Sequence, residues 1–516
     1  MEDRDATNLT LKKAIDQAFT SGFQLDKDSF NLLQELAHND QLENVMDKVL
    51  LNLKTLPENP LFITRSMIER AVQSLVEGSH ESSVGTIEGG GEAFNPLAKD
   101  IPSEIKVLSD PTDHISSTGD LNGFIQYFQS RFIRISQLLR DRLDVKDAIP
   151  IKDALHAPIK TKVKSIGIVT SIRERHGTIF LQIEDLDAMV TILVSSRADK
   201  TVREKAERVI LDQVICVEGV RSQSDLIVAT NFINPDIPDR KPNTAKKAIY
   251  AALLSDLHIG SKYFQEPAFH KFIRWLKGRE GNYRQREIAS RLKYIIIAGD
   301  LVDGVGIFPD QEKELVKADI YEQYDMAAQL IQQIPEYIDV IIIPGNHDAT
   351  RQALPQPAIN KEYAKPISQS RKVVMLGNPA KLRLNDVELL VSHGRSLDDI
   401  ISSVPDVMYR NLHDTVATAM KYFLKIRHLA PTYGNKTPIA PEIQDLLVID
   451  SVPDVFHAGH VHVLGYESYR GTLIVNSGSW QSQTPFQEKM GLIPSWGIAP
   501  ILNLRTLEIT PMDFTR

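Results

Sequence analysis

Five short segments in the second half of this chain each place metal-ligating residue types directly after an apolar run. They are Asp256-Leu257-His258, Gly299-Asp300-Leu301-Val302-Asp303, Gly345-Asn346-His347-Asp348, Ser392-His393-Gly394 and Gly459-His460-Val461-His462. This pattern is typical of buried strands that end in ligand-bearing loops. Because such loops lie side by side along one edge of a sheet, the segments predict a layered α/β fold with one shared metal site.

The residue types suit a pair of divalent ions. Such a pair, about 3.5–4 Å apart, binds both the attacking and the leaving oxygen during displacement at phosphorus. Its ligands are oxygen and imidazole groups, with one carboxylate shared between the ions. Asp300, at a strand tip, is the expected bridge, while Asn346 offers a carbonyl oxygen and His393 an imidazole.

Two pairs of ligand candidates are each separated by a single residue. Asp256 and His258 form one pair, and His460 and His462 form the other. On an extended backbone, residues at this spacing point to the same side. We therefore expect both pairs to lie on extended segments and to direct their side chains into one site.

The pattern along the chain predicts a multidomain α+β protein. We expect a helical bundle at 1–77, a flexible Gly/Ser/Glu-rich linker at 78–103 and a helical connector at 104–159. A second linker at 236–247 precedes an α/β domain at 248–516. Its expected strands are 248–254, 294–298, 340–344, 373–376, 389–392, 455–458 and 473–475.

In residues 160–235 the apolar residues follow the alternation typical of β-strands. Strands are expected at 163–172, 179–194, 213–220 and 225–232, with a helix at 198–209. A curved five-stranded pattern with one helix favours an OB-type barrel. Because Phe180 is almost the only aromatic residue in these strands, a barrel that binds protein is favoured over one that binds nucleic acid.

Composition narrows the class of protein. The net charge of -8, from 59 basic and 67 acidic residues, argues against a surface that binds nucleic acid throughout. The single cysteine, Cys216, excludes an internal disulfide and is expected to be buried in an apolar strand. Without an apolar leader or a membrane-length apolar stretch, we expect a soluble, cytoplasmic protein.

The five segments resemble the calcineurin-like metallophosphoesterases, whose pattern is D-x-H, G-D-x-x-D, G-N-H-D/E, H and G-H-x-H. All blocks occur in order across 256–462. The resemblance implies an α/β/β/α phosphoesterase sandwich at 248–516. It also implies two metal sites, the first formed by Asp256, His258, Asp300 and His462, and the second by Asp300, Asn346, His393 and His460.

The same resemblance makes His347 the general acid that protonates the leaving oxygen. Asp348 would orient the His347 ring and raise its basicity. Two interpretations of Asp303 stay open: it holds a metal ligand in place, or it caps the following loop. His457, on the strand before the last segment, is expected to be a packed core histidine.

Flanking segments resemble the small subunits of archaeal D-family DNA polymerases. The similar stretches are 345–357, 392–400 and 124–132, and the domain order agrees. The resemblance implies a 3′–5′ proofreading exonuclease with two divalent ions, manganese first, and magnesium, iron or zinc as alternatives. It also implies a large catalytic polymerase subunit as partner, and a single-stranded or mispaired DNA 3′ end as substrate. A sliding clamp or primase is a further candidate partner.

Arg351 and Arg395 adjoin the ligand segments and are candidate contacts to substrate phosphates. The alternative is that they pair with nearby carboxylates such as Asp398. Two other functions stay open for the chain: a non-catalytic scaffold subunit, and a stand-alone metallophosphatase or phosphodiesterase. The complete ligand set disfavours the scaffold, and the domains that precede the α/β domain disfavour the stand-alone enzyme.

Overall fold

The computed structural model describes residues 11–16, 18, 24–25, 27–36, 42–53, 62–63, 67–68, 94–117, 119–223, 225–405 and 407–516. The chain divides into two compact units, Met1–Ala93 and Phe94–Arg516. In the first unit, helices α2 (Lys27–Leu36) and α3 (Leu42–Leu53) share an apolar cluster, and β1 (Gln24–Leu25) pairs in parallel with β2 (Phe62–Ile63). The remaining residues of the helical bundle expected at 1–77, among them 69–77, and the linker residues 78–93 lie outside the described residues.

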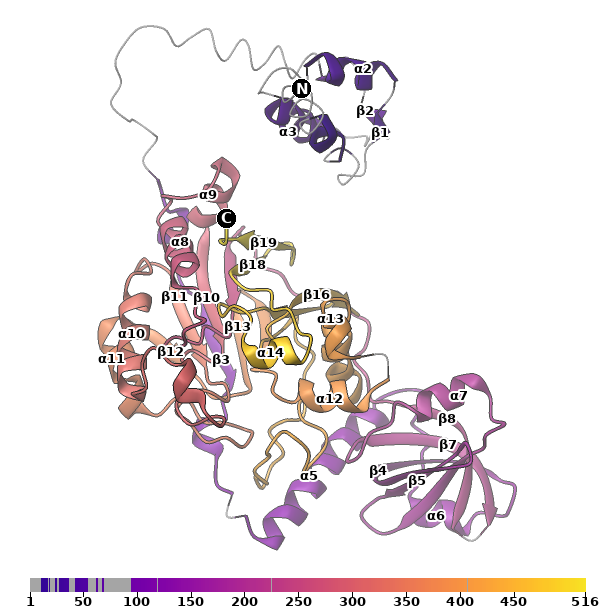
Figure 1. Ribbon diagram of the computed structural model, residues 1–516. Coiled ribbons are helices and arrows are strands. Elements are labelled where there is room, and N and C mark those ends of the chain that lie inside the picture. Colours follow the sequence, from indigo (N-terminus) through magenta and orange to yellow (C-terminus); the bar gives the residue numbers. More distant parts are fainter. Residues whose placement is uncertain are drawn as a thin grey trace, which may run out of the picture. The chain divides into compact units, whose positions relative to one another are not determined.

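Two six-stranded sheets form the centre of the second unit (Figure 1). The first has the order β12 (Val373–Met375), β11 (Asp339–Ile343), β10 (Leu292–Ala298), β9 (Tyr250–Leu254), β18 (Ile498–Asn503) and β19 (Ile509–Asp513). The second has the order β16 (Leu464–Tyr469), β17 (Thr472–Ser477), β15 (Val455–Ala458), β14 (Val387–Val391), β13 (Ala380–Leu384) and β3 (Ile105–Ser109). The strands β9 to β12 run parallel to one another, as do β14, β15 and β17.

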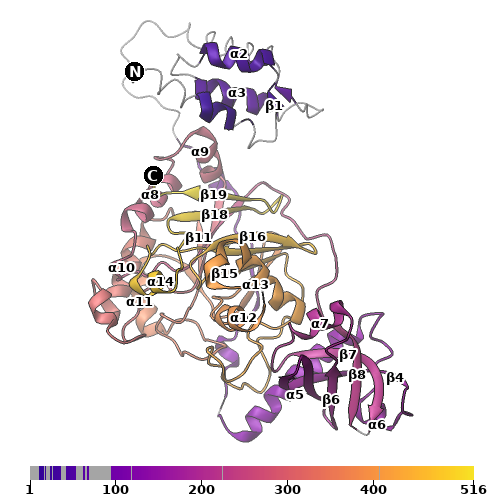
Figure 2. The same ribbon diagram turned by 45° about the vertical axis from the view of Figure 1, so that its right-hand side comes forward.

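Apolar side chains hold these layers together. One cluster fills the space between the sheets, with Leu253 and Ile296 from the first and Leu389 and Val455 from the second. The outer face of the first sheet is covered by α8 (Glu266–Leu276), α9 (Tyr283–Ser290), α10 (Ile320–Gln332) and α11 (Lys361–Ser370). The outer face of the second is covered by α12 (Leu397–Ser403) and α13 (Leu412–Ile426) (Figure 2). The result is a mixed α/β fold in which the two sheets pack face to face.

Five strands of these sheets were not predicted: β3, β13, β16, β18 and β19. Two of them contain proline, and Pro500 of β18 stands opposite Pro511 of the edge strand β19. Proline is unusual in strands, which hides β18 and β19 from a pattern search. Edge strand β16 is half-exposed and lacks a continuous apolar run.

Residues 94–109 differ from the flexible linker and purely helical connector expected for 78–103 and 104–159. Phe94, Ile101 and Ile105 pack against the sandwich core, and Lys293 Nζ donates to the carbonyl of Ala98 at 3.3 Å. Strand β3 then pairs with β13. The Gly- and Ser-rich composition that predicted a linker belongs to the residues before Phe94, and the few apolar groups after it are enough to fix the chain.

A closed five-stranded barrel precedes the sandwich. Its order is β4 (Lys162–Arg175), β5 (Thr178–Glu184), β6 (Met189–Val194), β8 (Leu226–Ile233) and β7 (Val214–Gln223), with α7 (Lys200–Ala206) between β6 and β7 and α6 (Ile151–His156) before β4. The long strand expected at 179–194 is two strands, because Asp185 Oδ1 accepts from the backbone of Asp187 and Ala188 and forms a turn. Cys216 is fully buried in β7, as expected, and burial raises the pKa of its thiol to about 12.

Helix α5 (Leu121–Arg140) contacts both the barrel and the sandwich. One arginine of this helix, Arg131, is only 1% exposed. The Arg131 guanidinium binds Asp445 at 2.8 Å and Tyr127 at 2.7 Å. Within the described ranges, no helix combines the length and apolar character needed to cross a bilayer.

Candidate metal centre

The structure brings all seven sequence-predicted ligands to one end of the two sheets. Asp256 and His258 follow β9, Asp300 follows β10 and Asn346 follows β11. From the second sheet, His393 follows β14, and His460 and His462 follow β15. These strands are parallel within each sheet, so their carboxyl ends meet at a shared edge.

The backbone that carries these residues is not extended. Asp256, His258 and Asp300 each have φ of 52°, and His460 and His462 have φ of 73° and 58°. The expectation that each D-x-H or H-x-H pair lies on an extended segment is therefore wrong, although the side chains of each pair converge. A left-handed conformation costs roughly 1–3 kcal/mol at a non-glycine residue and persists only where the surroundings impose it. Five such residues around one centre indicate a site shaped for function.

Glycines of the same segments allow the close packing of the ligands. A Cβ at Gly345 would collide with the Asp300 carboxylate, and one at Gly459 would collide with the Asp256 carboxylate. Glycine is therefore needed at both positions, because only a residue without Cβ lets the backbone lie against the ligand carboxylates.

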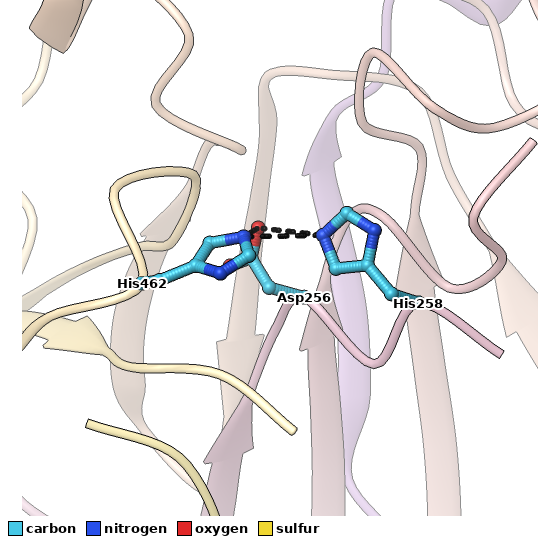
Figure 3. Close-up of side chains that lie close together, drawn as sticks. All are labelled: Asp256, His258 and His462. Atoms are coloured by element: carbon cyan, nitrogen blue, oxygen red, sulfur yellow. Dashed lines mark hydrogen bonds and ion pairs between the residues drawn. The ribbon is translucent and has the colours of Figure 1, made fainter. Parts of the chain in front are cut away.

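The first ligand group is Asp256, His258 and His462 (Figure 3). Asp256 Oδ1 lies 3.4 Å from His462 Nε2 and 3.9 Å from His258 Nε2, and the two Nε2 atoms are 3.1 Å apart. Asp256 Oδ1 is buried and accepts no hydrogen bond from the described part of the chain. Buried carboxylate oxygens are normally satisfied, so this convergence fits a cation.

The second ligand group is centred on His393. Its Nε2 lies 3.2 Å from Asp300 Oδ2, 3.0 Å from Asn346 Oδ1 and 3.3 Å from His460 Nδ1. Asp300 Oδ2 is also 3.7 Å from His258 Nε2 of the first group. One carboxylate oxygen thus faces both groups, which is the position that a shared ligand requires.

The electrostatics of the centre favour cations. Burial raises the pKa of Asp300, but the imidazoles of His393 and His347 outweigh it and hold that pKa well below its usual range. Burial lowers the pKa of His393, yet the charges of Asp300 and Asp256 reverse this and raise it to about 9. The field of the buried carboxylates therefore stabilises positive charge at this point.

Three ligand histidines are held by acceptors outside the ligand set. His258 Nδ1 donates to Asp303 Oδ1 at 2.9 Å, His393 Nδ1 to the Ala298 carbonyl at 2.9 Å, and His460 Nε2 to Asp398 Oδ2 at 3.1 Å. These bonds turn the opposite ring nitrogen toward the centre. Of the two interpretations of Asp303, the geometry favours the holding of a ligand.

Asp398 and Gln487 were missed as parts of the site. Asp398 lies in the first turn of α12, and its other oxygen accepts from Tyr409 at 2.5 Å. Gln487 lies in α14 (Pro485–Lys489), with Nε2 2.9 Å from His462 Nδ1. A carboxylate in a helix turn and an amide in a five-residue helix carry no local signal, since only the tertiary fold places them on a histidine.

His347 lies beside the centre but is not one of the seven predicted ligands. Its Nδ1 donates to the Asp303 carbonyl at 2.6 Å, and its ring meets that of His258 edge-on at 4.7 Å. Its backbone N–H donates to Asp300 Oδ1 at 2.8 Å. His347 also comes close to His258 and Asp303 in a third possible cation group.

The expected contact of Asp348 with the His347 ring is wrong. The Asp348 carboxylate accepts from the backbone N–H of Gly345, Leu301 and Val302, at 2.8, 3.3 and 3.4 Å. Adjacent residues in this turn point to opposite sides, so Asp348 ties the loops of β10 and β11 together. Burial and the Asp300 charge raise the pKa of Asp348 to about 6.

Arg351 and Arg395 both have protein partners. Arg351 binds Glu442 at 2.7 Å and the Pro355 carbonyl at 2.8 Å, which agrees with the carboxylate-pairing alternative. Arg395 donates to the carbonyl and side-chain oxygens of Gln352, each at 3.0 Å, and not to Asp398. His457 is fully buried on β15 against Ser477, as expected of a core histidine, and burial lowers its pKa to about 3.

The chain is similar to known proteins over most of its length. Residues 251–463 match the model of the DNA polymerase alpha/epsilon B-subunit family. A "DNA polymerase II small subunit" from Methanothermobacter thermautotrophicus is 35% identical over 95% of this chain and 97% of its own length. Relatives of the same description from Archaeoglobus fulgidus and Pyrococcus furiosus are each 40% identical, over 76% and 77% of this chain. The aligned part is 77% of the Archaeoglobus protein but only 64% of the Pyrococcus protein.

Proposed function

Because this chain belongs to the family of archaeal DNA polymerase II small subunits, we propose that it is a two-metal 3′–5′ exonuclease that removes mispaired nucleotides. The observation that carries the proposal is the complete ligand set, with Asp300 Oδ2 between His258 and His393. A subunit that served only as a scaffold would not need these seven side chains or the left-handed backbone that positions them.

The residues present fit two divalent ions, and manganese is the ion we propose. The donors are carboxylate and amide oxygens and imidazole nitrogens, which suit manganese, magnesium, iron or zinc. Asp256, His258, Asp300 and His462 would hold one ion, and Asp300, Asn346, His393 and His460 the other. When bound, the pair supplies an activated water and neutralises charge on the scissile phosphate.

Residues of the chain hold and deliver the proton that the leaving oxygen receives. His347 Nδ1 is fixed by the Asp303 carbonyl, which leaves Nε2 as the ring atom that can donate. We assign to the protonated His347 ring the transfer of its Nε2 proton to the leaving 3′ oxygen, after which the neutral ring keeps its Nδ1 proton on the Asp303 carbonyl. The backbone N–H of His347 donates to Asp300, so the acid and the shared ligand keep a fixed relation.

The rest of the chain suits a subunit of a larger polymerase. The barrel, with its helix between the third and fourth strands, supports an OB-type assignment and a role in binding the large catalytic subunit. The net charge of -8 agrees with a partner that provides most of the DNA-binding surface. A clamp or primase is the partner we propose for the N-terminal unit.

Digestion of DNA tests the exonuclease proposal. A 5′-labelled oligonucleotide with a matched or mispaired 3′ end is incubated with the protein and Mn²⁺. We expect stepwise shortening by wild type and its loss in Asp300→Asn, with Asp386→Asn, in the turn between β13 and β14, as an exposed control of the same substitution. Equal digestion by Asp300→Asn would show that the activity does not come from this centre. No digestion by wild type, alone or with its large subunit, would reject the proposal in favour of a scaffold. Cleavage of small phosphodiesters only would favour a stand-alone phosphodiesterase.

A further inference from the structure

A cavity of about 790 Å³ opens onto the metal centre. His258, His347 and His460 line one side of it. Apolar side chains line another part, and three of them are left in contact with solvent: Phe486 is 69% exposed, Met490 44% and Phe308 38%. Large apolar groups beside a catalytic cleft usually mark a binding surface.

The position of Phe486 is tied to that of a metal ligand. The helix α14 begins with a capping box, in which Thr484 Oγ1 accepts from the N–H of Gln487 and Gln487 Oε1 accepts from the N–H of Thr484. The same Gln487 reaches His462 Nδ1 with its Nε2 and is buried. Because its neighbour is anchored in this way, Phe486 stands at a fixed place relative to the centre while its ring remains exposed.

Charged side chains of both signs line the cavity. Lys489 is on α14 with Phe486, and Lys436 lies by Tyr409, with its Nζ 5.9 Å from the ring centre. The loop of Phe308 carries Asp310 and, further along, Glu314. The phosphates of a polyanion that enters the cavity would meet positive charge at Lys436 and Lys489.

We propose that this cleft takes an unpaired terminal nucleotide, with its base stacked on Phe486 and its phosphate directed to the metal centre. The inference rests on the proposed function and names the form of its substrate. An exposed aromatic ring binds any base through its face, whereas a base paired inside a duplex has both faces covered. A frayed or mispaired end therefore enters more readily than a matched one, without any reading of base identity.

Binding measurements with the full-length chain test the role of Phe486. Every protein tested carries His347→Ala, which keeps the seven metal ligands but slows digestion. Its affinity for fluorescent single-stranded DNA is measured in Mn²⁺. The strands end in a normal nucleotide or in one that lacks its base. We expect the base to strengthen binding about 5- to 100-fold. Phe486→Ala should reduce this ratio to near one, and Phe486→Trp should preserve it.

Tyr283→Ala serves as the control, because Tyr283 is 76% exposed on α9 and does not line the cavity. It should leave the ratio unchanged. If the base strengthens binding to Phe486→Ala as much as to the protein with Phe486, the inference is overturned. It is also overturned if Phe486→Ala no longer binds the large subunit but binds DNA unchanged, because Phe486 would then be a protein contact. If the base effect depends on Phe486 but the protein with His347 intact digests no strand, the binding site stands and the exonuclease proposal fails.

Discussion

Replacing Asp303 by asparagine should weaken metal binding without removing the general acid. The carboxylate accepts three hydrogen bonds: Oδ1 from His258 Nδ1 at 2.9 Å and from Gln481 at 3.1 Å, and Oδ2 from Gln311 at 3.0 Å. Asparagine keeps one acceptor oxygen and turns an NH₂ group toward the other donors. His258 Nδ1 thus loses its hydrogen bond to a charged carboxylate, or shares the neutral asparagine oxygen with another donor.

The size of the effect follows from that lost bond. A hydrogen bond to a charged group contributes about 1.5–3 kcal/mol, which corresponds to about 10- to 100-fold in affinity. We expect the Mn²⁺ affinity of the site containing His258 to fall by this factor. His347 should keep its orientation, because its acceptor is the backbone carbonyl of Asp303. Hydrolysis should therefore recover largely at saturating metal.

Isothermal titration with Mn²⁺, followed by rates at rising metal concentration, measures both parts. Asp386→Asn is the matched control, since Asp386 is exposed, pairs with Lys246 and does not line the cavity at the metal centre. An Asp303→Asn protein that binds Mn²⁺ as tightly as wild type would show that Asp303 does not hold a ligand. A loss of activity that no metal concentration restores would show that its side chain has a direct role in the reaction.

Three further changes have defined outcomes. His347→Ala should slow hydrolysis by about 10²- to 10⁴-fold while the number of bound ions, measured by mass spectrometry of metals, stays at the wild-type value. Asp445→Asn should destabilise the fold by about 3–5 kcal/mol in urea unfolding, because Arg131 is left buried without its counter-charge; Asp450→Asn, the half-exposed partner of Arg134, should cost under about 1 kcal/mol. Burial lowers the pKa of His457 to about 3, below its value of about 6.5 in the unfolded chain, so the unfolded state binds more protons and stability falls as pH drops. Between pH 7 and 5 this histidine should account for about 2 kcal/mol, and His457→Asn should show a pH dependence smaller by that amount.

The ligands were predictable because each is fixed by two local signals, an apolar strand and a polar residue directly after it. Asp300 and His393 needed nothing more. The local backbone was not predictable, because a positive φ is uncommon at residues other than glycine and the sequence carries no sign of it at Asp256 or His258. Adjacency in sequence also gave the wrong prediction that Asp348 contacts the His347 ring, because the Asp348 side chain points away from its neighbour.

Groups that act through other residues were the hardest to find. Asp398 reaches His460 across 62 positions of the chain, and Gln487 reaches His462 from a five-residue helix with no periodic pattern of its own. The burial of Arg131 also has no local signal, because its partner Asp445 is 314 positions away. Such pairs are set by tertiary structure and not by local propensity.

The most direct test of the two-metal centre is the number of Mn²⁺ ions bound per chain in wild type and in Asp300→Asn. Since Asp300 Oδ2 faces both His258 and His393, the shared carboxylate predicts two ions in wild type. Asp300→Asn should then lose or weaken both, while Asp386→Asn binds as wild type. A wild-type chain that binds a single ion, or an Asp300→Asn chain that keeps two with unchanged affinity, would contradict the account.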